Sequence, residues 1–275
     1  MINSIAIVGC GWFGLPLAKT LLANGMTVNG SKRSAEQAET LKQQGIKGFV
    51  LDLDNPQACD NPQTLDGLKT DAIVINIPPG LRRGEGLYLE RLNLLKALIS
   101  DHHYQKIVFI STTGVYPATG EVMREDDAFG HSPQAAILCQ AEAVFAELPN
   151  CVIVRFAGLV GPKRHPGRFL AGKTGLSGAE LSVNMTHLDD CIGSVSAILA
   201  HPKPPSNAYS VCAPQHPSKQ TFYQAAASQL GLTLPTFLAP SSDEYDKVVD
   251  GSRITRDLNF HYKHPDPLLM LGACE

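Results

Sequence analysis

A run of glycines near the N-terminus has the spacing of a phosphate-binding turn. Gly9, Gly11 and Gly14 follow four apolar residues at positions 5–8. They lie before and at the start of residues 12–24, whose apolar side chains recur at helical spacing. The glycines therefore fall on a predicted strand-to-helix turn. There Gly9 would permit the tight turn, Gly11 would let a pyrophosphate approach the backbone, and Gly14 would let the helix pack closely on the strand. Because the helix N-terminus adds N–H groups that attract phosphates, the pattern predicts that the chain binds a dinucleotide.

The residues after the second predicted strand indicate which dinucleotide is bound. That strand is expected at residues 27–30, and a site that prefers NAD usually has a carboxylate at its end, about 20 residues past the glycines. Here Ser31 and Arg33 occupy this stretch, and the first carboxylate is that of Glu36. A carboxylate would repel a 2′-phosphate, whereas an arginine can bind one through two hydrogen bonds and a serine can donate to it. We therefore predict NADP in preference to NAD; the alternative is an ordinary solvated loop.

Composition and charge exclude several classes of protein. The 275 residues are enough for one large α/β domain with a smaller appendage, and a net charge of −3 without a basic stripe argues against a nucleic-acid partner. No apolar run of about 18 residues is present and no signal peptide precedes the first strand, so we expect a cytoplasmic protein without a membrane partner. The seven cysteines form no CxxC pair and the nine histidines no HExxH motif. We expect neither disulfides nor a bound metal.

Strand and helix patterns alternate along the chain and predict the fold class. Further strands are expected at residues 48–51, 72–77, 106–110, 151–155 and 208–212, and further helices at 88–100, 132–148 and 188–199. Continuous apolar strands separated by helices predict a parallel sheet buried on both faces, which is an α/β doubly wound fold of Rossmann type. Ligands of such sheets bind at the carboxyl ends of the strands, so the candidate site residues should lie there.

Motifs at these strand ends, together with the glycines, carry a family resemblance. They read STTGVY at residues 111–116, FAGLVGP at 156–162 and MTHLDD at 185–190, and a later segment at 252–258 reads SRITRDL. Nearly the whole chain thereby resembles the extended short-chain dehydrogenases/reductases, the group that contains the NAD-dependent epimerases and dehydratases. The resemblance implies a cofactor domain in residues 1–159, completed by about 188–212. It also implies a C-terminal substrate region, interleaved with that domain, in residues 160–275.

The resemblance also assigns roles to individual residues. Asp52 and Leu53 match the pair that meets the adenine, and Ile77, Pro78 and Pro79 replace the small residues that line the nicotinamide ribose. The predicted cofactor contacts are Gly9, Gly11, Trp12, Phe13, Gly14, Ser31, Arg33, Asp52, Leu53, Ile77, Pro78, Pro79 and Ser111. Family members often pair through the helices that flank the fifth strand, which implies a homodimer.

One departure from the family is as informative as the match. The family carries a Tyr-x-x-x-Lys dyad on a helix, with a glutamate four residues past the lysine. Glu142 matches that glutamate, which puts Leu138 at the lysine position and Gln134 at the tyrosine position. A leucine cannot hydrogen-bond ribose hydroxyls, and a glutamine cannot exchange a proton near neutral pH. The chain is therefore identified as an atypical member that lacks the dyad and its usual mechanism.

Other residues are candidates for chemistry on a substrate. Thr112 matches the family's catalytic hydroxyl, and Tyr116 is the tyrosine on a predicted sheet-end loop, so these two are the catalytic candidates. A packing role is the alternative for Tyr116. Thr113, Lys163 and His187 are the candidates for substrate contact. Of these, Lys163 would suit a phosphate-bearing substrate, and His187 could act as an acid or base.

Three arginines near strand ends have competing interpretations. Arg155 ends a buried strand, where its charge needs a partner; Asp189 or Asp190 could supply one, which would make the arginine structural. Arg82 and Arg83 follow the fourth strand and could meet an anionic substrate or the pyrophosphate. Adjacent arginines on a loop are, however, more often simply solvated.

The combined pattern predicts an NADP-binding oxidoreductase or epimerase/dehydratase-like protein. It would act by a non-standard mechanism on a small polar molecule of nucleotide-sugar type. A non-catalytic NADP-binding or redox-sensing protein is the alternative, because it too would lack the dyad. Residues 1–35 also resemble the 6-phosphogluconate and 3-hydroxyacid dehydrogenases, but the long all-helical second domain of those enzymes disagrees with the strand patterns past residue 150.

Overall fold

The computed structural model describes residues 2–59, 61–80, 86–241 and 243–274, and its elements follow the predicted order. The strands are β1 (Ser4–Val8), β2 (Thr27–Lys32), β3 (Lys47–Val50), β4 (Ala72–Ile75), β5 (Lys106–Thr112), β6 (Val122–Met123), β7 (Cys151–Phe156), β8 (Gly158–Val160), β9 (Met185–His187), β10 (Ala208–Val211) and β11 (Val248–Val249). The α-helices are α1 (Gly14–Ala23), α2 (Ala35–Lys42), α3 (Pro56–Cys59), α4 (Pro62–Leu68), α5 (Tyr88–Ile99), α6 (Pro133–Ala146), α7 (Gly167–Leu170), α8 (Leu188–Ala200), α9 (Lys219–Gln229), α10 (Ser252–Leu258) and α11 (Pro267–Met270). Short 3₁₀ helices are η2 (Thr113–Val115), η3 (Glu125–Asp127) and η4 (Leu271–Ala273).

The main sheet has the strand order of a doubly wound Rossmann fold, which confirms the predicted fold class. Within the described residues it contains seven strands in the order β3-β2-β1-β4-β5-β7-β10. β1 pairs in parallel with β2 on one side and with β4 on the other, so that Ile7 lies opposite both Gly30 and Val74. The order of the strands reverses between β1 and β4, and ligands of such sheets bind outside the carboxyl ends of the strands at this point. The residues that follow β1 and β4 are therefore placed to hold a cofactor.

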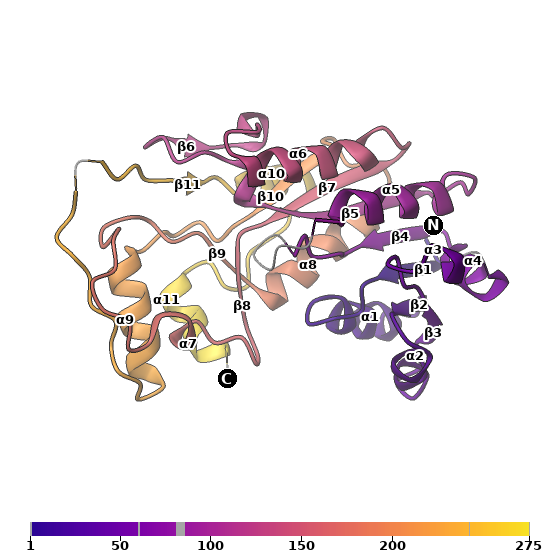
Figure 1. The fold of residues 1–275 in the computed structure, drawn as a ribbon, viewed down its shortest axis with the longest axis horizontal. Coiled ribbons are helices and arrows are strands. Elements are labelled where there is room, and N and C mark those ends of the chain that lie inside the picture. Colours follow the sequence, from indigo (N-terminus) through magenta and orange to yellow (C-terminus); the bar gives the residue numbers. More distant parts are fainter. Residues whose placement is uncertain (1, 60, 81–85, 242, 275) are drawn as a thin grey trace. The chain divides into compact units, whose positions relative to one another are not determined.

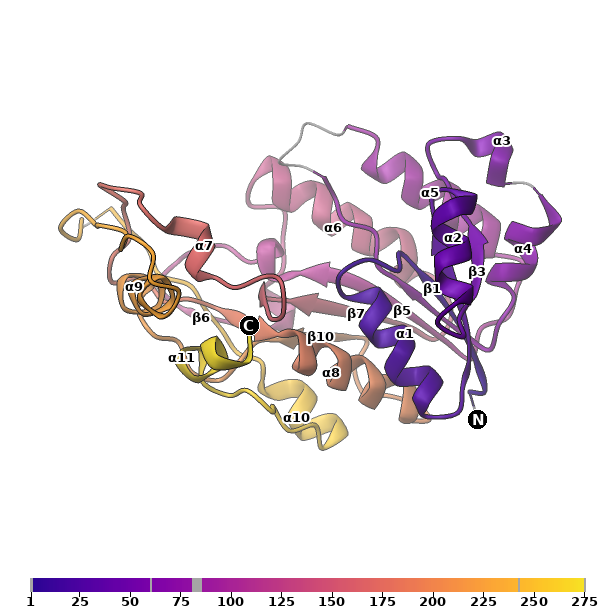
Figure 2. The same ribbon diagram turned by 90° about the horizontal axis from the view of Figure 1, so that it is seen from below.

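Helices cover both faces of this part of the sheet and bury alternate side chains of each strand. α5 and α6 lie along one face, and α1 lies along the other (Figures 1 and 2). Ala6 and Val8 of β1 belong to a buried cluster with residues of α5 and α6. Ile5 and Ile7, which point to the opposite face, are fully buried as well. Burial on both faces explains why each strand is a continuous apolar run in the sequence.

β2 and β5 each continue two residues past their predicted ends, and this changes the surroundings of three candidate residues. β2 continues to Lys32, so Ser31 is a buried strand residue. β5 continues to Thr112, so Ser111 and Thr112 are strand residues as well. Because successive side chains of a strand point to opposite faces, the side chains of Ser111 and Thr112 point to opposite faces of the sheet.

The chain forms two compact units. The first comprises Met1–Thr112, Gly130–Val154 and Val195–Ala208, and the second comprises Thr113–Phe129, Arg155–Ser194 and Tyr209–Glu275. The second unit has its own apolar core, which includes Val160, Phe222 and Met270. It also contains two short parallel strand pairs, β8 with β9 and β6 with β11. These strands disagree with an all-helical second domain, while the predicted division into cofactor and substrate regions stays a prediction.

The described part of the chain contains no helix that is both long enough and apolar enough to cross a membrane. The seven cysteines form no disulfide with one another in the described structure. Burial raises the pKa of the Cys10 and Cys151 thiols to about 12, so both are protonated near neutral pH and act as apolar packing groups.

Candidate functional site

The glycine turn after β1 is shaped partly by the packing of the protein itself. Gly9 has a φ of 97°, and a Cβ added there would lie 2.1 Å from the carbonyl oxygen of Asn76. A Cβ at Gly14 would lie 2.3 Å from the carbonyl oxygen of Gly9. A Cβ at Gly11, in contrast, would meet no heavy atom of the described residues within 4 Å. The chain therefore needs glycine at positions 9 and 14 for its own packing, while at Gly11 the space is open to a ligand that approaches the backbone.

Asn76, which sequence reasoning did not single out, holds this turn in place. It directly follows β4, and its side-chain amide donates to the carbonyl oxygen of Gly9 at 3.1 Å. Its backbone N–H donates to the carbonyl oxygen of Val8 at 2.8 Å and so extends the pairing of β1 with β4. A polar residue that interrupts the apolar run at residues 72–77 is the signal that could have identified it. Asn76 thus ties together the two strands between which the sheet order reverses.

The N-terminus of α1 lacks the side-chain cap that several other helices have. Serine or asparagine side chains cap α2, α4, α6 and α9 through Ser34, Asn61, Ser132 and Ser218. At α1, Phe13 occupies the cap position without a capping hydrogen bond from its side chain, and no acidic residue lies in the first turn. Such an end favours an anionic ligand, because the helix dipole and the first N–H groups both attract negative charge. The glycine turn and this helix end fit a dinucleotide pyrophosphate.

Ser31 supports the glycine turn from the neighbouring strand. Its hydroxyl oxygen accepts the backbone N–H of Gly9 at 3.0 Å, and its side chain is buried. We predicted that this hydroxyl donates to a 2′-phosphate. The observed contact favours a positioning role for Ser31, because a buried side chain that is already bonded to the turn is poorly placed to reach a ligand at the strand end.

Arg33 carries an exposed cation directly after β2. Its guanidinium is 67% exposed and lies 3.6 Å from the carboxylate of Asp54, which follows β3. Arg91 on α5 binds the same carboxylate at 2.6 Å and is nearly buried. Since Arg91 already neutralises Asp54, the long contact between Asp54 and Arg33 can be exchanged for another anion at little cost. Sequence reasoning gave Asp54 no role because the residue lies beyond the next strand along the chain.

The other predicted cofactor contacts lie at the ends of β1, β3, β4 and β5. Asp52, Leu53 and Ile77 are half-buried. Ser111 donates its hydroxyl hydrogen to the buried carboxylate of Glu142 on α6 at 2.5 Å, which ties this side chain to the helix. Among the remaining predicted cofactor contacts, Phe13 is buried, Trp12 and Pro79 are half-buried, and Pro78 is exposed. Their contacts with a cofactor stay predictions.

The matched dyad positions on α6 carry no titratable side chain. Leu138 is buried and Gln134 is exposed, one helical turn apart. Neither side chain can hold or move a proton near neutral pH. Arg82 and Arg83, the suggested anion contacts, lie outside the described residues.

Tyr116, in the second unit, is committed to a buried hydrogen-bond network. Only 1% of its surface is exposed, and its hydroxyl lies 2.7 Å from that of Ser210 and accepts an N–H of Arg155 at 2.9 Å. The guanidinium of Arg155 also lies over the tyrosine ring, 5.3 Å from its centroid. Burial raises the pKa of Tyr116, although Arg155 and Ser210 oppose this shift. The geometry favours the packing role over proton transfer to a substrate.

Tyr116→Phe is therefore expected to lower the free energy of unfolding by about 1–2 kcal/mol, because buried polar partners lose a hydrogen bond. The ring keeps its packing, while Ser210 and one N–H of Arg155 lose this contact. Urea unfolding measures the change. Tyr245→Phe is the control, since Tyr245 is 63% exposed, and equal stability of wild type and Tyr116→Phe would contradict the packing role.

Arg155 has partners other than the predicted ones. Its Nη1 donates to the hydroxyl of Tyr116 at 2.9 Å and to the carbonyl oxygen of Glu125 at 2.7 Å. The carboxylates of Asp189 and Asp190 accept hydrogen bonds from the segment at residues 263–264, and their pairing with Arg155 stays a prediction. A carbonyl and an aromatic face can stabilise a buried guanidinium, but sequence spacing does not reveal them. The expected structural role of Arg155 agrees with these contacts.

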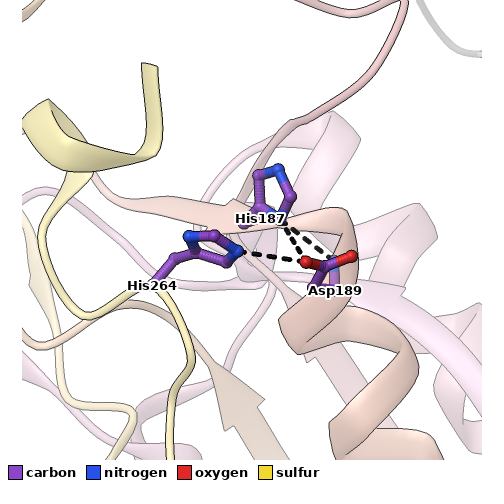
Figure 3. Close-up of side chains that lie close together, drawn as sticks. All are labelled: His187, Asp189 and His264. Carbon is purple, nitrogen blue, oxygen red and sulfur yellow. Dashed lines mark hydrogen bonds and ion pairs between the residues drawn. The ribbon is translucent and has the colours of Figure 1, made fainter. Parts of the chain in front are cut away.

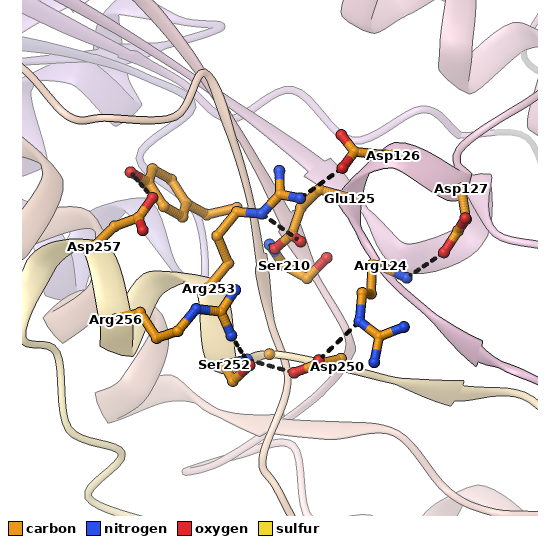
Figure 4. A network of polar contacts seen from close by, with 12 residues as sticks. Arg124, Glu125, Asp126, Asp127, Ser210, Asp250, Ser252, Arg253, Arg256 and Asp257 are labelled. Atoms are coloured by element: carbon orange, nitrogen blue, oxygen red, sulfur yellow. Dashed lines mark hydrogen bonds and ion pairs between the residues drawn. The ribbon is translucent and has the colours of Figure 1, made fainter.

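A polar network connects the SRITRDL segment to the turn after β6 (Figure 4). Arg253 on α10 binds Glu125 at 3.0 Å and Asp126 at 2.8 Å. Glu125 is buried, and its carboxylate also accepts the backbone N–H of Ser210 at 2.8 Å. Burial raises the pKa of Glu125, while the contacts with Ser210 and Arg253 favour its charged form. The segment therefore has a structural task within the second unit, which is to neutralise a buried carboxylate.

His187 lies in the interior at the start of α8 (Figure 3). Its side chain is 2% exposed. Nδ1 accepts the backbone N–H of Asp189 at 3.1 Å, and Nε2 donates to the carbonyl oxygen of Ala273 at 3.1 Å. With both ring nitrogens bonded to the backbone, the geometry favours a helix-capping role over the predicted contact with a substrate.

His187, Asp189 and His264 lie close enough together to resemble a metal site. The Asp189 carboxylate oxygen, however, accepts from Lys263 at 2.5 Å and lies 3.1 Å from His264 Nε2. Both ring nitrogens of His187 are bonded to the backbone, and the ammonium of Lys263 already binds the Asp189 carboxylate. These side chains therefore do not fit a metal ion. Asp190 also accepts the backbone N–H groups of Lys263 and His264, and the cluster fits a joint that holds this segment to α8.

The burial of His187 predicts a specific pH dependence of stability. Burial lowers the pKa of His187 below its ordinary value of 6.5, so the unfolded chain takes up a proton at a pH where the folded protein does not. Stability from neutral His187 is thus present above about pH 6.5 and declines as the pH falls further, by at most about 1.4 kcal/mol per pH unit. His187→Asn keeps a capping acceptor and should flatten this part of the curve. Urea unfolding at a series of pH values measures both slopes, and identical slopes would refute the assignment.

The remaining candidates are Thr112, Thr113 and Lys163. Thr112 ends β5 and is half-buried, and Thr113 begins η2 and is buried. Lys163 is exposed and has a φ of 63°, in a turn where the N–H of Arg164 donates to the carbonyl oxygen of Gly161 at 2.9 Å. A left-handed backbone costs a lysine about 1 kcal/mol or more, so its neighbours must hold this turn. The roles of these three residues stay predictions.

Comparisons with known sequences agree with this geometry. Residues 4–77 match the family model described as the NAD binding domain of 6-phosphogluconate dehydrogenase, a span that contains the glycine turn, Arg33 and Asn76. Protein YeeZ of Escherichia coli (strain K12) is 39% identical to this chain over 273 residues, which is 98% of each protein. The likeness to YeeZ therefore extends over both compact units.

Solved structures share the fold of the whole chain. A Methylobacillus flagellatus protein, assigned in name to the NAD-dependent epimerases/dehydratases, aligns over 100% of this chain and 98% of its own, with a TM-score of 0.78 and 23% identity. The enzyme WbmG of Bordetella bronchiseptica, solved in complex with NAD, aligns over 99% of this chain and 93% of its own, with a TM-score of 0.79 and 15% identity. At such identities the similarity establishes the fold.

Proposed function

This chain belongs to the family of the Escherichia coli protein YeeZ and has the fold of the NAD-dependent epimerases and dehydratases, and on that basis we propose that it is an NADP-binding oxidoreductase or epimerase/dehydratase-like enzyme. Its proposed substrate is a small polar molecule of nucleotide-sugar type. The observation that carries the proposal is the glycine turn, where Gly11 leaves open space beside the uncapped N-terminus of α1. A cytoplasmic location and a homodimer stay predictions.

NADP in preference to NAD is supported by the charges at the end of β2. Arg33 is exposed there, and the nearby carboxylate of Asp54 is neutralised by Arg91. No carboxylate occurs in residues 27–35, where one would repel a 2′-phosphate. A guanidinium that is not tightly paired can bind the 2′-phosphate through two hydrogen bonds.

The mechanism must differ from that of the family. A bound nicotinamide would supply hydride transfer. We propose that Thr112, at the end of β5, contributes a hydroxyl that hydrogen-bonds an oxygen of the substrate. Gln134 and Leu138 cannot move a proton, and Tyr116 is buried in its own network. The proton must therefore come from a group other than the family's tyrosine.

A binding and turnover panel tests the proposal. Calorimetric titration with NADPH, NADP, NADH and NAD should give the lowest Kd for a phosphorylated form. The protein is then incubated with NADP and UDP-sugars, or with NADPH deuterated at C4, and the sugars are analysed by NMR. A changed sugar stereocentre, or deuterium in the sugar, supports the enzyme. If none of the four dinucleotides binds, the proposal is wrong.

A non-catalytic NADP-binding or redox-sensing protein is the second candidate. The leucine at position 138 and the burial of Tyr116 favour it, because a leucine carries no exchangeable proton and the hydroxyl of Tyr116 is bonded within the protein. Such a protein would bind NADPH and NADP with different affinities and leave every sugar unchanged. Limited proteolysis that differs between the NADPH and NADP complexes, without turnover in the same panel, would favour this candidate over the enzyme.

A further inference from the structure

Lys247 places an ammonium group against the turn that follows β5. The residue directly precedes β11, and its Nζ lies 3.2 Å from the carbonyl oxygen of Tyr116 and 3.4 Å from that of Thr113. These carbonyls lie at the two ends of the short turn that begins with η2. The cation therefore contacts the turn that carries Thr113, one of the candidates for substrate contact.

This ammonium has no carboxylate partner among the described residues. The acidic side chains that flank it in the sequence are engaged elsewhere: Asp246 accepts the N–H and hydroxyl of Ser182 at 2.8 and 2.7 Å, and Asp250 lies 3.3 Å from Arg124. Burial lowers the pKa of Lys247, because part of the water around its charge has been removed. Two carbonyl oxygens supply only partial negative charge, so within the described part of the chain this half-buried cation is left without a counter-ion.

The backbone on both sides of this cation is held by side chains. Asn184 donates to the carbonyl oxygen of Lys247 at 2.6 Å and accepts the N–H of Val249 at 2.8 Å. The N–H of Lys247 itself donates to the carboxylate of Asp246 at 2.8 Å. Because the peptide groups around Lys247 are fixed in this way, its side chain starts from a defined position, as a binding group requires.

We propose that Lys247 binds an anionic oxygen group of the substrate, a carboxylate or a phosphoryl group, beside the turn that begins with Thr113. An ammonium has three N–H donors, and the two carbonyls use two of them, so the third serves the ligand. A negative charge at this place completes the pairing and raises the pKa of Lys247 toward its ordinary value of 10.5. The inference rests on the proposed function, since it assigns the charge of that same substrate.

The first experiment measures the ammonium directly in the wild-type protein. The ε-carbon of Lys247 is followed by NMR in ¹³C-lysine-labelled protein through a pH titration with NADPH present, and its signal is assigned by its loss in Lys247→Arg. The probes are glucose, glucuronate and glucose 1-phosphate. Glucuronate or glucose 1-phosphate should raise the pKa by about one unit or more, and neutral glucose should not. A pKa raised only by glucuronate indicates a carboxylate ligand, and one raised only by glucose 1-phosphate indicates a phosphoryl ligand. If neither anion raises the pKa of Lys247, the inference is overturned.

The second experiment compares variants in calorimetric binding of the anion that acts. Lys247→Met should weaken this binding about 10- to 100-fold, and Lys247→Arg should restore most of it because the charge is kept. Lys219→Met is the matched control, since Lys219 lies in the same unit and also donates to a backbone carbonyl, that of Ser177 at 2.8 Å. Equal binding by wild type and Lys247→Met overturns the inference. If Lys247→Met does not fold, the wild-type titration decides.

Titration with NADPH alone separates this inference from the proposed function. NADPH binding combined with an unmoved pKa of Lys247 overturns only the role assigned to the lysine. Absence of binding by NADPH and the other three dinucleotides overturns the proposed function itself.

Discussion

Gly11→Ala is expected to remove most dinucleotide binding while leaving the fold intact. A methyl group at this position meets no heavy atom of the described residues within 4 Å, so the free energy of unfolding should change by less than about 0.5 kcal/mol. The same methyl group would occupy the space through which a pyrophosphate reaches the backbone. Loss of one or two hydrogen bonds to a charged group corresponds to a Kd for NADPH raised about 10- to 100-fold or more.

Gly9→Ala is the matched variant for the other use of glycine in this turn. Gly9 has a φ of 97°, and an added Cβ would lie 2.1 Å from the carbonyl oxygen of Asn76. A left-handed backbone costs alanine about 1–2 kcal/mol, and the overlap adds the displacement of β4 from β1, so we expect a loss of about 3 kcal/mol or more. Urea unfolding and NADPH titration of both variants separate the two effects.

Binding and stability of these two variants together show which glycine serves the ligand and which serves packing. If Gly11→Ala binds NADPH as tightly as the wild type, the turn after β1 is not the pyrophosphate site. If Gly11→Ala is as unstable as Gly9→Ala, position 11 is a packing position and the open space there has no functional meaning. We expect Gly9→Ala to lower the free energy of unfolding and Gly11→Ala to raise the Kd for NADPH.

Arg33→Ala is expected to raise the Kd for NADPH about 10- to 100-fold and to leave the Kd for NADH nearly unchanged, because only NADPH carries the 2′-phosphate. The guanidinium is 67% exposed, so the substitution removes little packing and should not change the fold. The affinity of the wild type for NADPH should also fall with added salt more steeply than its affinity for NADH, because salt screens the phosphate contact.

Two further variants control for the charge itself. Arg33→Lys should retain part of the preference for NADPH, because it keeps the charge but loses the paired hydrogen bonds. Lys42→Ala removes another exposed cation of the first unit, one paired with Glu39 at 2.6 Å on α2, and should have no effect on either Kd. A wild type that binds NAD more tightly than NADP, or an equal loss of NADPH and NADH in Arg33→Ala, would refute the NADP assignment.

Two of the candidate site residues show where sequence reasoning stops. Tyr116 was singled out because it follows a strand whose carboxyl end carries ligands in this fold class, and His187 because it lies in one of the motifs that carry the family resemblance. In the structure the hydroxyl of Tyr116 is bonded to Ser210, 94 positions away, and Nε2 of His187 to Ala273, 86 positions away. No motif or apolar period in the sequence around Tyr116 or His187 indicates that Ser210 or Ala273 will bind it. A strand-end side chain therefore cannot be assigned to chemistry or to packing before its distant neighbours are known.

The sequence by itself determined the α/β fold class, the order of the main elements and the glycine turn after the first strand. These follow from local rules: apolar runs mark strands buried on both faces, and glycine spacing reflects backbone conformations that other residues avoid. Only the tertiary structure decided that Gly9 and Gly14 serve packing while Gly11 is open, and that Ser31 and Asn76 hold the turn. It also decided that Lys247 contacts two backbone carbonyl oxygens and has no carboxylate partner among the described residues. These properties depend on which distant atoms surround a side chain, and burial and charge pairing arise only when the chain has folded.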